Sequence, residues 1–332
     1  MPGAAGLLAP PAPLLAQSRE FWQTVDAAQL RAGVDIGLSS PGALIRLSPA
    51  RGAAALTSRE LKLHANGKPV ALQATASDVQ LQAAGMDVAP GTAMARVAPG
   101  NGPGRYRLTA AAANGRYVMH VFEPDSNVVL RARADRNHAV AGNTVSVTVD
   151  LSHDGRAVPM KAEALLVAPD GSSQTATVVR GRDGSIRASA RMPSSNGTTP
   201  GLWELQVFAT GDGVQRDART AFAVAQPTAR FSGVQSVNAA ALRIALPVQA
   251  GSPGRYEARG TLYATGPDHV LRPVAQGHSA TWMQPGTHTL VLSFDRKHLP
   301  TGYGAPFEVR QLELHDQTRI APLEVRARGL RF

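Results

Sequence analysis

A strand signature that returns four times limits what this chain can fold into. It reads Gly-Arg-Tyr-Arg-Leu from Gly104, Gly-Arg-Tyr-Val-Met from Gly115, Gly-Leu-Trp-Glu-Leu from Gly201 and Gly-Arg-Tyr-Glu-Ala from Gly254. In each copy a turn glycine precedes a strand whose aromatic residue starts an alternation of apolar and polar positions. Such alternation is typical of antiparallel strands with one buried and one solvated face. The chain is therefore predicted to be all-β.

The spacing of strands and turns divides the 332 residues into three predicted sandwiches. Sandwich domains commonly run to about 100 residues each. The predicted domains are residues 33–127, 128–226 and 227–332, and residues 1–32 are predicted to form a short irregular N-terminal arm or linker. The middle domain has the clearest pattern, with the about seven strands that an immunoglobulin-like sandwich needs. We therefore expect three tandem immunoglobulin-like β-sandwich domains.

The N-terminal residues are the least regular part of the chain. Met1–Gln17 is rich in Ala, Leu and Pro, but it lacks the basic start and the small-residue cleavage pattern of a secretory signal. We interpret it as a linker whose signal peptide lies outside this sequence. Gln17–Leu30, around Phe21 and Trp22, is the only stretch near the start that favours a helix or an extended arm.

The formal net charge of +10 raises the question of nucleic acid. Lys62, Lys68, Lys161 and Lys297 are the only lysines, and the arginines are spread along all three predicted domains. Nucleic-acid-binding domains usually concentrate positive charge on one face and add aromatic rings for stacking. We therefore expect no nucleic-acid partner. No apolar stretch approaches the about 20 residues of a membrane-spanning helix, so no membrane span is expected.

Three strand phrases carry a resemblance to a family. They are His-Val-Phe-Glu-Pro at 120–124, Gly-Leu-Trp-Glu-Leu at 201–205 and Pro-Phe-Glu-Val-Arg-Gln-Leu-Glu-Leu-His-Asp at 306–316. With them the chain resembles an uncharacterised family of exported gammaproteobacterial proteins with three tandem immunoglobulin-like domains, a domain of unknown function. The middle domain is also similar to accessory sandwiches found beside von Willebrand-type and protease domains. The resemblance implies a periplasmic or secreted protein with an interaction-type role, and it brings no catalytic residues.

Sequence patterns for catalysis are absent. The chain has no cysteine, which excludes thiol catalysis, disulfides and thiolate zinc sites. It also lacks Gly-x-Ser-x-Gly, glycine-rich phosphate loops, and His-x-x-x-His or His-Glu-x-x-His pairs. We therefore predict that the protein is not an enzyme and has no catalytic residues, metal site or cofactor, with calcium as the one weak possibility.

The calcium possibility comes from carboxylates in turns. Loop carboxylates gathered at one end of a sandwich supply the hard oxygen ligands that Ca²⁺ prefers. Asp-Gly and Pro-Asp-Gly turns, however, need Asp for local hydrogen bonding alone, and we favour this interpretation. The residues concerned are Asp125, Asp154, Asp170, Asp183 and Asp212.

Exposed aromatic rings are the remaining candidates for ligand contact. Trp203 begins an alternating strand and is predicted to fill a sandwich core. Trp282 and Tyr303 are less tightly patterned, and Tyr303 lies in the loop sequence Thr-Gly-Tyr-Gly-Ala-Pro. Because planar rings bind the faces of sugars, these two are the candidate glycan contacts.

Three functions are compatible with these patterns. The favoured hypothesis is a non-catalytic exported protein that presents its sandwiches to a protein partner. The alternative is a carbohydrate-binding array or cryptic hydrolase acting on envelope polysaccharide. A third hypothesis is an accessory scaffold of a larger secreted protease.

Overall fold

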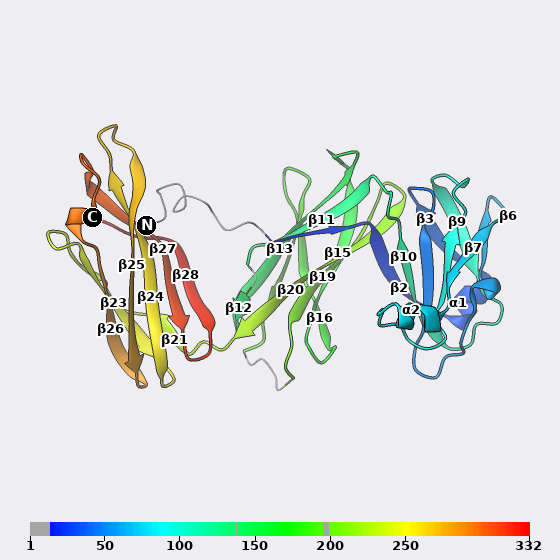
Figure 1. Ribbon diagram of the computed structural model, residues 1–332, viewed down its shortest axis with the longest axis horizontal. Coiled ribbons are helices and arrows are strands. Elements are labelled where there is room, and N and C mark those ends of the chain that lie inside the picture. The colour runs from blue at the N-terminus through cyan, green and yellow to red at the C-terminus, as the bar shows by residue number, and fades with distance from the viewer. Residues whose placement is uncertain (1–13, 137, 195–198) are drawn as a thin grey trace.

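The computed structural model describes residues 14–136, 138–194 and 199–332. It consists almost entirely of strands, which form six sheets that pair into three β-sandwiches. Figure 1 shows the sandwiches in a row, with the middle one between the N-terminal and C-terminal ones. The predicted fold class, all-β with immunoglobulin-like sandwiches, is confirmed. Residues 1–13, part of the predicted linker, lie outside the described residues.

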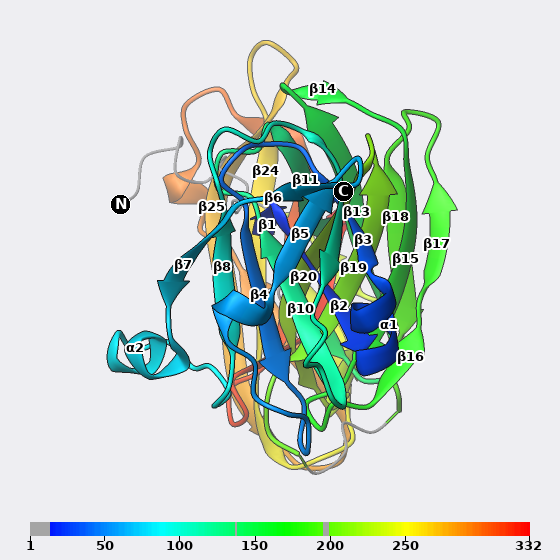
Figure 2. The same ribbon diagram turned by 90° about the vertical axis from the view of Figure 1, so that its right-hand side faces the viewer.

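The first sandwich packs a five-stranded sheet of order β2-β10-β4-β8-β7 against a four-stranded sheet of order β3-β9-β5-β6. Figure 2 looks onto this sandwich and shows α2 projecting beyond β7. The elements are β2 (Glu20–Asp26), α1 (Ala27–Ala32), β3 (Val34–Leu38), β4 (Leu44–Pro49), the 3₁₀ helix η2 (Ser58–Glu60), β5 (Lys62–Ala65), β6 (Lys68–Val70), β7 (Leu72–Ala76), α2 (Asp78–Ala83), β8 (Ala93–Val97), β9 (Gly104–Thr109) and β10 (Arg116–Phe122).

The middle sandwich packs the sheet β1-β11-β13-β18-β17, with β14 beside β13, against the sheet β12-β20-β19-β15-β16. Its strands are β1 (Leu14–Ser18), β11 (Val128–Ala134), β12 (His138–Val140), β13 (Thr144–His153), β14 (Arg156–Ala157), β15 (Met160–Val167), β16 (Ser173–Thr175), β17 (Thr177–Arg180), β18 (Ile186–Arg191), β19 (Trp203–Gly211) and β20 (Val214–Ala225).

The C-terminal sandwich packs the sheet β21-β23-β22, with β26 also on β23, against the sheet β25-β24-β27-β28. Its elements are β21 (Ala229–Phe231), β22 (Ser236–Asn238), β23 (Arg243–Ala250), β24 (Gly254–Thr265), β25 (Leu271–Met283), β26 (Gly286–Ser293), the 3₁₀ helix η3 (Arg296–His298), β27 (Gly304–Asp316) and β28 (Ala321–Arg331).

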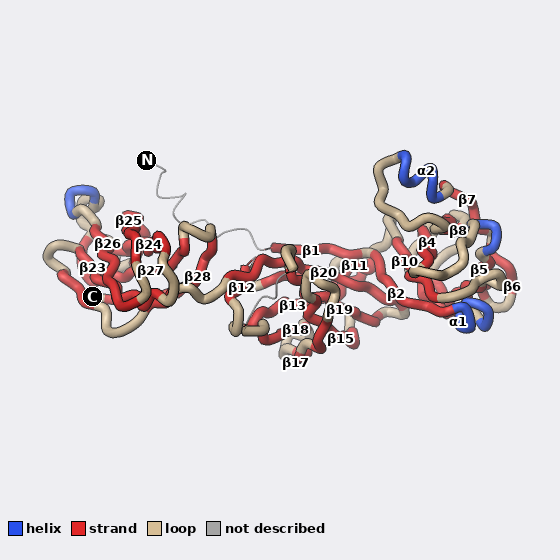
Figure 3. The backbone as a smooth tube through the Cα atoms, turned by 90° about the horizontal axis from the view of Figure 1, so that it is seen from below, coloured by secondary structure: helices blue, strands red, loops and turns tan. Residues whose placement is uncertain are grey.

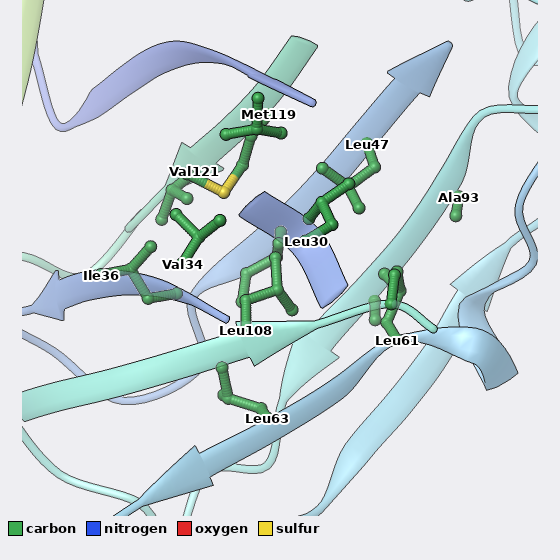
Figure 4. Packing of buried hydrophobic residues seen from close by; sticks show 14 of the residues in the cluster. Leu30, Val34, Ile36, Leu47, Leu61, Leu63, Ala93, Leu108, Met119 and Val121 are labelled. Atoms are coloured by element: carbon green, nitrogen blue, oxygen red, sulfur yellow. The ribbon is translucent and has the colours of Figure 1, made fainter. Parts of the chain in front are cut away.

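Each sandwich encloses its own hydrophobic core, and the alternation seen in the sequence supplies it. In β13, Val147, Val149 and Leu151 all point inward, as a period of two requires. Trp203 is only 7% exposed and belongs to the same core, as predicted. Figure 4 shows the first core, where Leu30 of α1 lies among side chains from both sheets.

The aromatic residue of the recurring signature anchors the loop before its strand. Tyr106, Tyr117 and Tyr256 are all buried. The hydroxyl of Tyr117 donates to the carbonyl oxygen of Asn114 at 3.1 Å, just before β10, and that of Tyr256 donates to the carbonyl oxygen of Ser252 at 2.8 Å, just before β24. A buried hydroxyl needs such a partner, so the ring fills the core while its oxygen fastens the adjoining loop.

The prediction of an irregular N-terminal arm is wrong for residues 14–32. They form β1, β2 and α1, and the extended β2 and most of α1 fall within Gln17–Leu30, the stretch expected to be a helix or an extended arm. The partners are distant in the sequence: β1 pairs with β11, and β2 pairs with β10. Because the pairing is long-range, the short strands carry little local signal of their own. The capping box of Asp26 and Gln29 fixes the start of α1.

Candidate functional site

Two neighbouring chain connections, from β1 to β2 and from β10 to β11, cross the junction between the first and middle sandwiches. Only Arg19 separates β1, in the middle sandwich, from β2, in the first. Beside it, β10 continues through residues 123–127 into β11. The amide of Glu123 donates to the carbonyl oxygen of Arg19 at 3.0 Å, which continues the ladder across the gap. Figure 3 shows β1 along the middle sandwich and β2 entering the first. Two connections oppose bending here.

A buried ion pair lies at the centre of this junction. Nη2 of Arg216, in β20, lies 2.5 Å from Oε2 of Glu123, and neither side chain is exposed (0%). The same nitrogen donates to the hydroxyls of Ser39 at 2.8 Å and Ser126 at 3.0 Å, and Nε donates to the carbonyl of Val128 at 3.0 Å. The guanidinium of the middle sandwich is thus held by groups of the first sandwich and of the connection.

The carboxylate of Glu123 is satisfied by main chain of the first sandwich. Its Oε1 accepts the amide hydrogens of Ser39 at 2.6 Å and of Ser40 at 2.9 Å, just beyond β3. Burial lowers the pKa of Arg216, and the charge of Glu123 opposes that effect. Since the pair is fully desolvated and hydrogen-bonded, removal of either partner would leave a buried charge without its counter-charge.

Close backbone approach also marks the junction. A Cβ on Gly37, in β3, would lie 2.0 Å from the carbonyl oxygen of Gly213, in the β19–β20 turn. No side chain fits in that space, so the two sandwiches touch there through main chain alone.

A second contact across the junction joins Trp22 to Asp217. Trp22 lies in β2, the edge strand of its sheet, so an unpaired amide faces outward. That amide donates to Oδ2 of Asp217, in β20, at 2.7 Å. Asp217 is 5% exposed, and its burial raises its pKa to about 7, against the opposing effects of the Trp22 amide and Arg219.

The indole ring of Trp22 is covered by side chains from both sandwiches. It stacks on the imidazole of His120, with ring centroids 4.8 Å apart and planes 9° apart. The guanidinium of Arg219 lies 4.4 Å from the indole centroid. Nε2 of His120 also lies 2.7 Å from a carboxylate oxygen of Glu20. Beside this cluster, the two sandwiches enclose a cleft of about 440 Å³ lined by Trp22, Phe208 and Asp217 among others.

The junction between the middle and C-terminal sandwiches is built differently. One covalent connection, residues 226–228, joins β20 to β21. Thr228 is fastened to the C-terminal sandwich because its hydroxyl donates to Asp316 at 2.7 Å. A cleft of about 320 Å³ separates β12 from β28, with His138 on one wall and Glu324 on the other. Burial, followed by the charges of Arg136 and His315, lowers the pKa of His138.

The structure places the two predicted glycan contacts at opposite ends of the C-terminal sandwich. Trp282 is 56% exposed near the end of β25, opposite Arg255 of β24. The hydroxyl of Tyr303 accepts from Nη1 of Arg272 at 3.3 Å, near the start of β25. Ten residues of strand separate Arg272 from Trp282, about 33 Å at about 3.3 Å per residue. The two rings therefore do not form one platform.

Two of the turn carboxylates bind the turns that contain them. Oδ1 of Asp170 accepts the amide of Ser172 at 2.9 Å and its hydroxyl at 2.6 Å. Asp183 makes the same pair of bonds with Ser185, at 3.1 Å and 2.7 Å. These hydrogen bonds lower the pKa of each carboxyl, the Ser hydroxyl being the largest cause. Both aspartates thus have the local turn role that the sequence favours.

The other turn aspartates do not gather into a metal centre. Nδ1 of His153 lies 2.7 Å from Asp212 and Nε2 lies 3.6 Å from Asp154, while Asp125 is exposed elsewhere. In the part of the chain that the structure describes, no group of three or more His, Asp or Glu side chains is arranged to hold a metal ion. No helix within the described ranges is long and apolar enough to cross a bilayer.

Sequence reasoning missed Arg216 and Asp217, although a signal was present. The stretch Val214–Ala218 alternates, and Arg216 shares its parity with the apolar Val214 and Ala218. Two adjacent charged residues in mid-strand require one of them to point into the sandwich. Arg216 is that inward residue.

Two family profiles match the chain and together cover about two thirds of it. The N-terminal domain of DUF4785, a domain of unknown function, matches residues 4–123, and its C-terminal domain matches residues 228–332. The chain belongs to the DUF4785 family. The match to the N-terminal domain includes the residues of β1 and β2.

Solved structures support the fold. A DUF4785 family protein from Legionella pneumophila is 20% identical, with a TM-score of 0.64, over 97% of this chain and 90% of that one. The matches to Escherichia coli alpha-2-macroglobulin (13% identity, TM-score 0.27, 96% of this chain and 20% of that one) and to titin domains A168–A170 (9%, 0.22, 96% and 99%) are too distant to carry an argument. No curated protein matches the chain.

Proposed function

We propose that this DUF4785 protein is an exported, non-catalytic scaffold that holds binding surfaces for a protein partner at a fixed spacing. The observation that carries the proposal is the junction of the first two sandwiches. Two chain connections (β1 to β2 and β10 to β11), the buried Glu123–Arg216 pair and the Gly37–Gly213 contact all join the same two sandwiches. Together these contacts oppose movement of the first sandwich relative to the middle one, as a scaffold of fixed geometry requires.

The use of the buried charges supports the same proposal. The oxygens of Glu123 are bound by Arg216 and by main-chain amides, and a carboxylate oxygen of Asp217 accepts the amide hydrogen of Trp22. Their hydrogen bonds connect sandwiches to each other. They hold strands and loops in place, which is the role of a structural group.

Trp282 is the residue we propose as a contact with the partner. Trp and Arg dominate the energy of protein interfaces, and Trp282 is half-exposed opposite Arg255 on a strand at the sheet edge. The same exposed indole favours glycan binding as the second candidate function, because planar aromatic rings pack on sugar faces.

Capture from the fractionated envelope and medium of the source bacterium tests the proposal. We expect the chain to enrich a specific protein, and Trp282→Ala to reduce that enrichment. Val179→Ala, which changes an exposed apolar residue in the middle sandwich, is the matched control. Enrichment of polysaccharide without protein would favour the glycan function. Location of the native protein in the cytoplasm would contradict export.

A further inference from the structure

Strand register places an aromatic ring between two carboxyl groups on the outer face of the middle sandwich. Glu163 of β15 lies opposite Phe208 of β19, and Phe208 lies opposite Asp217 of β20. Directly opposed residues in antiparallel strands have Cβ atoms about 4.5–5.5 Å apart. The three side chains therefore form one row across the sheet.

This row lies within the cleft between the first and middle sandwiches. Phe21, Trp22 and Gln23 of β2 form the opposite wall, and the cleft volume is about 440 Å³. Asp217 lines the cleft although only 5% of its surface is exposed. The site thus combines the ring of Phe208 with a largely desolvated carboxyl group, while the indole of Trp22 is already covered by His120 and Arg219.

Neither carboxyl group forms a salt bridge within the described residues, although Arg219 and Arg216 act on Asp217 from farther away. Among the residues that the structure describes, no Lys, Arg or His nitrogen lies within ion-pair distance of Asp217 or Glu163. Lys161 lies in the next row of the sheet, opposite Thr210. Arg219 lies over the indole of Trp22, and Arg216 points inward to Glu123.

We propose that this cleft binds an ammonium-type cation. The ring of Phe208 lies between the carboxyl groups of Asp217 and Glu163, which supply opposite charge, and β2 of the first sandwich closes the site. An aromatic ring attracts a nearby cation through its quadrupole, most strongly where the site is desolvated. The ammonium group belongs either to a free small amine or to a lysine side chain of a peptide, and the chemistry of recognition is the same.

Binding by this site depends on pH. Asp217, with its pKa raised to about 7 by burial, is about one tenth ionised at pH 6 and about nine tenths ionised at pH 8. A cation that binds the ionised form therefore binds about tenfold more tightly at pH 8. The charged groups that face Asp217 are Glu20 and His120, paired on the first sandwich, together with Glu163, Lys161, Arg216 and Arg219 on the middle one.

Calorimetric titration of the full chain with tetramethylammonium, 1,4-diaminobutane and a blocked lysine peptide tests the proposal. We expect at least one probe to bind, about tenfold more tightly at pH 8 than at pH 6. Binding of the amines assigns a free small cation, and binding of the peptide alone assigns a lysine side chain. The absence of binding by all three probes at pH 8 would overturn the proposal.

Variants locate the binding. Glu163→Gln changes an exposed residue and leaves the fold intact, and it should weaken binding severalfold. Asp217→Asn keeps an acceptor for the Trp22 amide, and it should abolish the pH dependence. Asp150→Asn, on the opposite sheet, is the matched control and should bind as the wild type does. Unchanged affinity and pH dependence in both cleft variants would overturn the assignment.

Discussion

Replacing Glu123 by Gln tests whether the buried pair at the first junction holds the two sandwiches together. The substitution keeps the size of the side chain and an amide oxygen that accepts from Ser39 and Ser40. It removes the charge that lies 2.5 Å from Nη2 of Arg216, at a place where neither side chain is exposed (0%). The guanidinium then remains buried without its counter-charge.

The expected loss of stability follows from this burial. Removing one partner of a buried pair costs about 3–5 kcal/mol. Arg216 keeps its bonds to Ser39, Ser126 and Val128, so we expect the lower end, about 3 kcal/mol. If the free energy of unfolding falls by about 3 kcal/mol per M of urea, this loss lowers the urea midpoint of unfolding by about 1 M.

Urea unfolding followed by tryptophan fluorescence measures this shift. Trp22 and Trp203 report on the first two sandwiches, and Trp282 reports on the third. We expect the urea midpoint reported by Trp22 and Trp203 to fall and the midpoint reported by Trp282, in the C-terminal sandwich, to stay unchanged. Asp35→Asn is the control, because its partner Arg107 and Asp35 itself are 57% and 68% exposed, and surface pairs contribute about 1 kcal/mol or less. Equal shifts for Glu123→Gln and Asp35→Asn would refute the reasoning.

Two further substitutions test the same junction. Asp217 has a folded pKa raised to about 7 above its ordinary value, so the native state holds a proton that the unfolded chain has lost between about pH 4 and pH 7. The free energy of unfolding should therefore fall as the pH rises through that window, by at most about 1.4 kcal/mol per pH unit. Asp217→Asn should flatten the dependence of the thermal midpoint on pH. A variant with the same pH dependence as the wild type would contradict the assignment to Asp217. Gly37→Ala places a Cβ 2.0 Å from the carbonyl of Gly213, so we expect a thermal midpoint several degrees lower, whereas Gly100→Ala, with open space around it, serves as the control. Equal midpoints for the two alanine variants would show that the close approach is not a constraint.

The strands that could be predicted are those whose signal is local. A turn glycine followed by an aromatic residue and an alternating run is enough to find β9, β10, β19 and β24, because the period of two fixes which face is buried. The same logic places Trp203 in the core. β1 and β2 could not be found in this way, since their pairing partners, β11 and β10, lie about 100 residues further along the chain.

The junction depends on geometry that one sequence does not reveal. The parity of Arg216 shows that it points inward, but its partner, Glu123, lies in the preceding sandwich, and nothing in the sequence pairs the two residues. Trp282 and Tyr303 look equivalent as exposed aromatic residues, and only the direction of β25 shows that they lie at opposite ends. Which two distant side chains meet is set by the register of the sheets, which one sequence alone does not determine.

Distances between spin labels test the fixed spacing of the first two sandwiches most directly. The chain has no cysteine, so each introduced pair is the only labelled pair. Cysteines at Gln73 and Thr175 span the first junction, those at Thr175 and Thr289 span the second, and those at Arg133 and Thr175 lie within the middle sandwich. We predict a distance distribution across the first junction as narrow as that within the middle sandwich, with a wider one across the second. A broad distribution between Gln73 and Thr175 would contradict the scaffold proposed here.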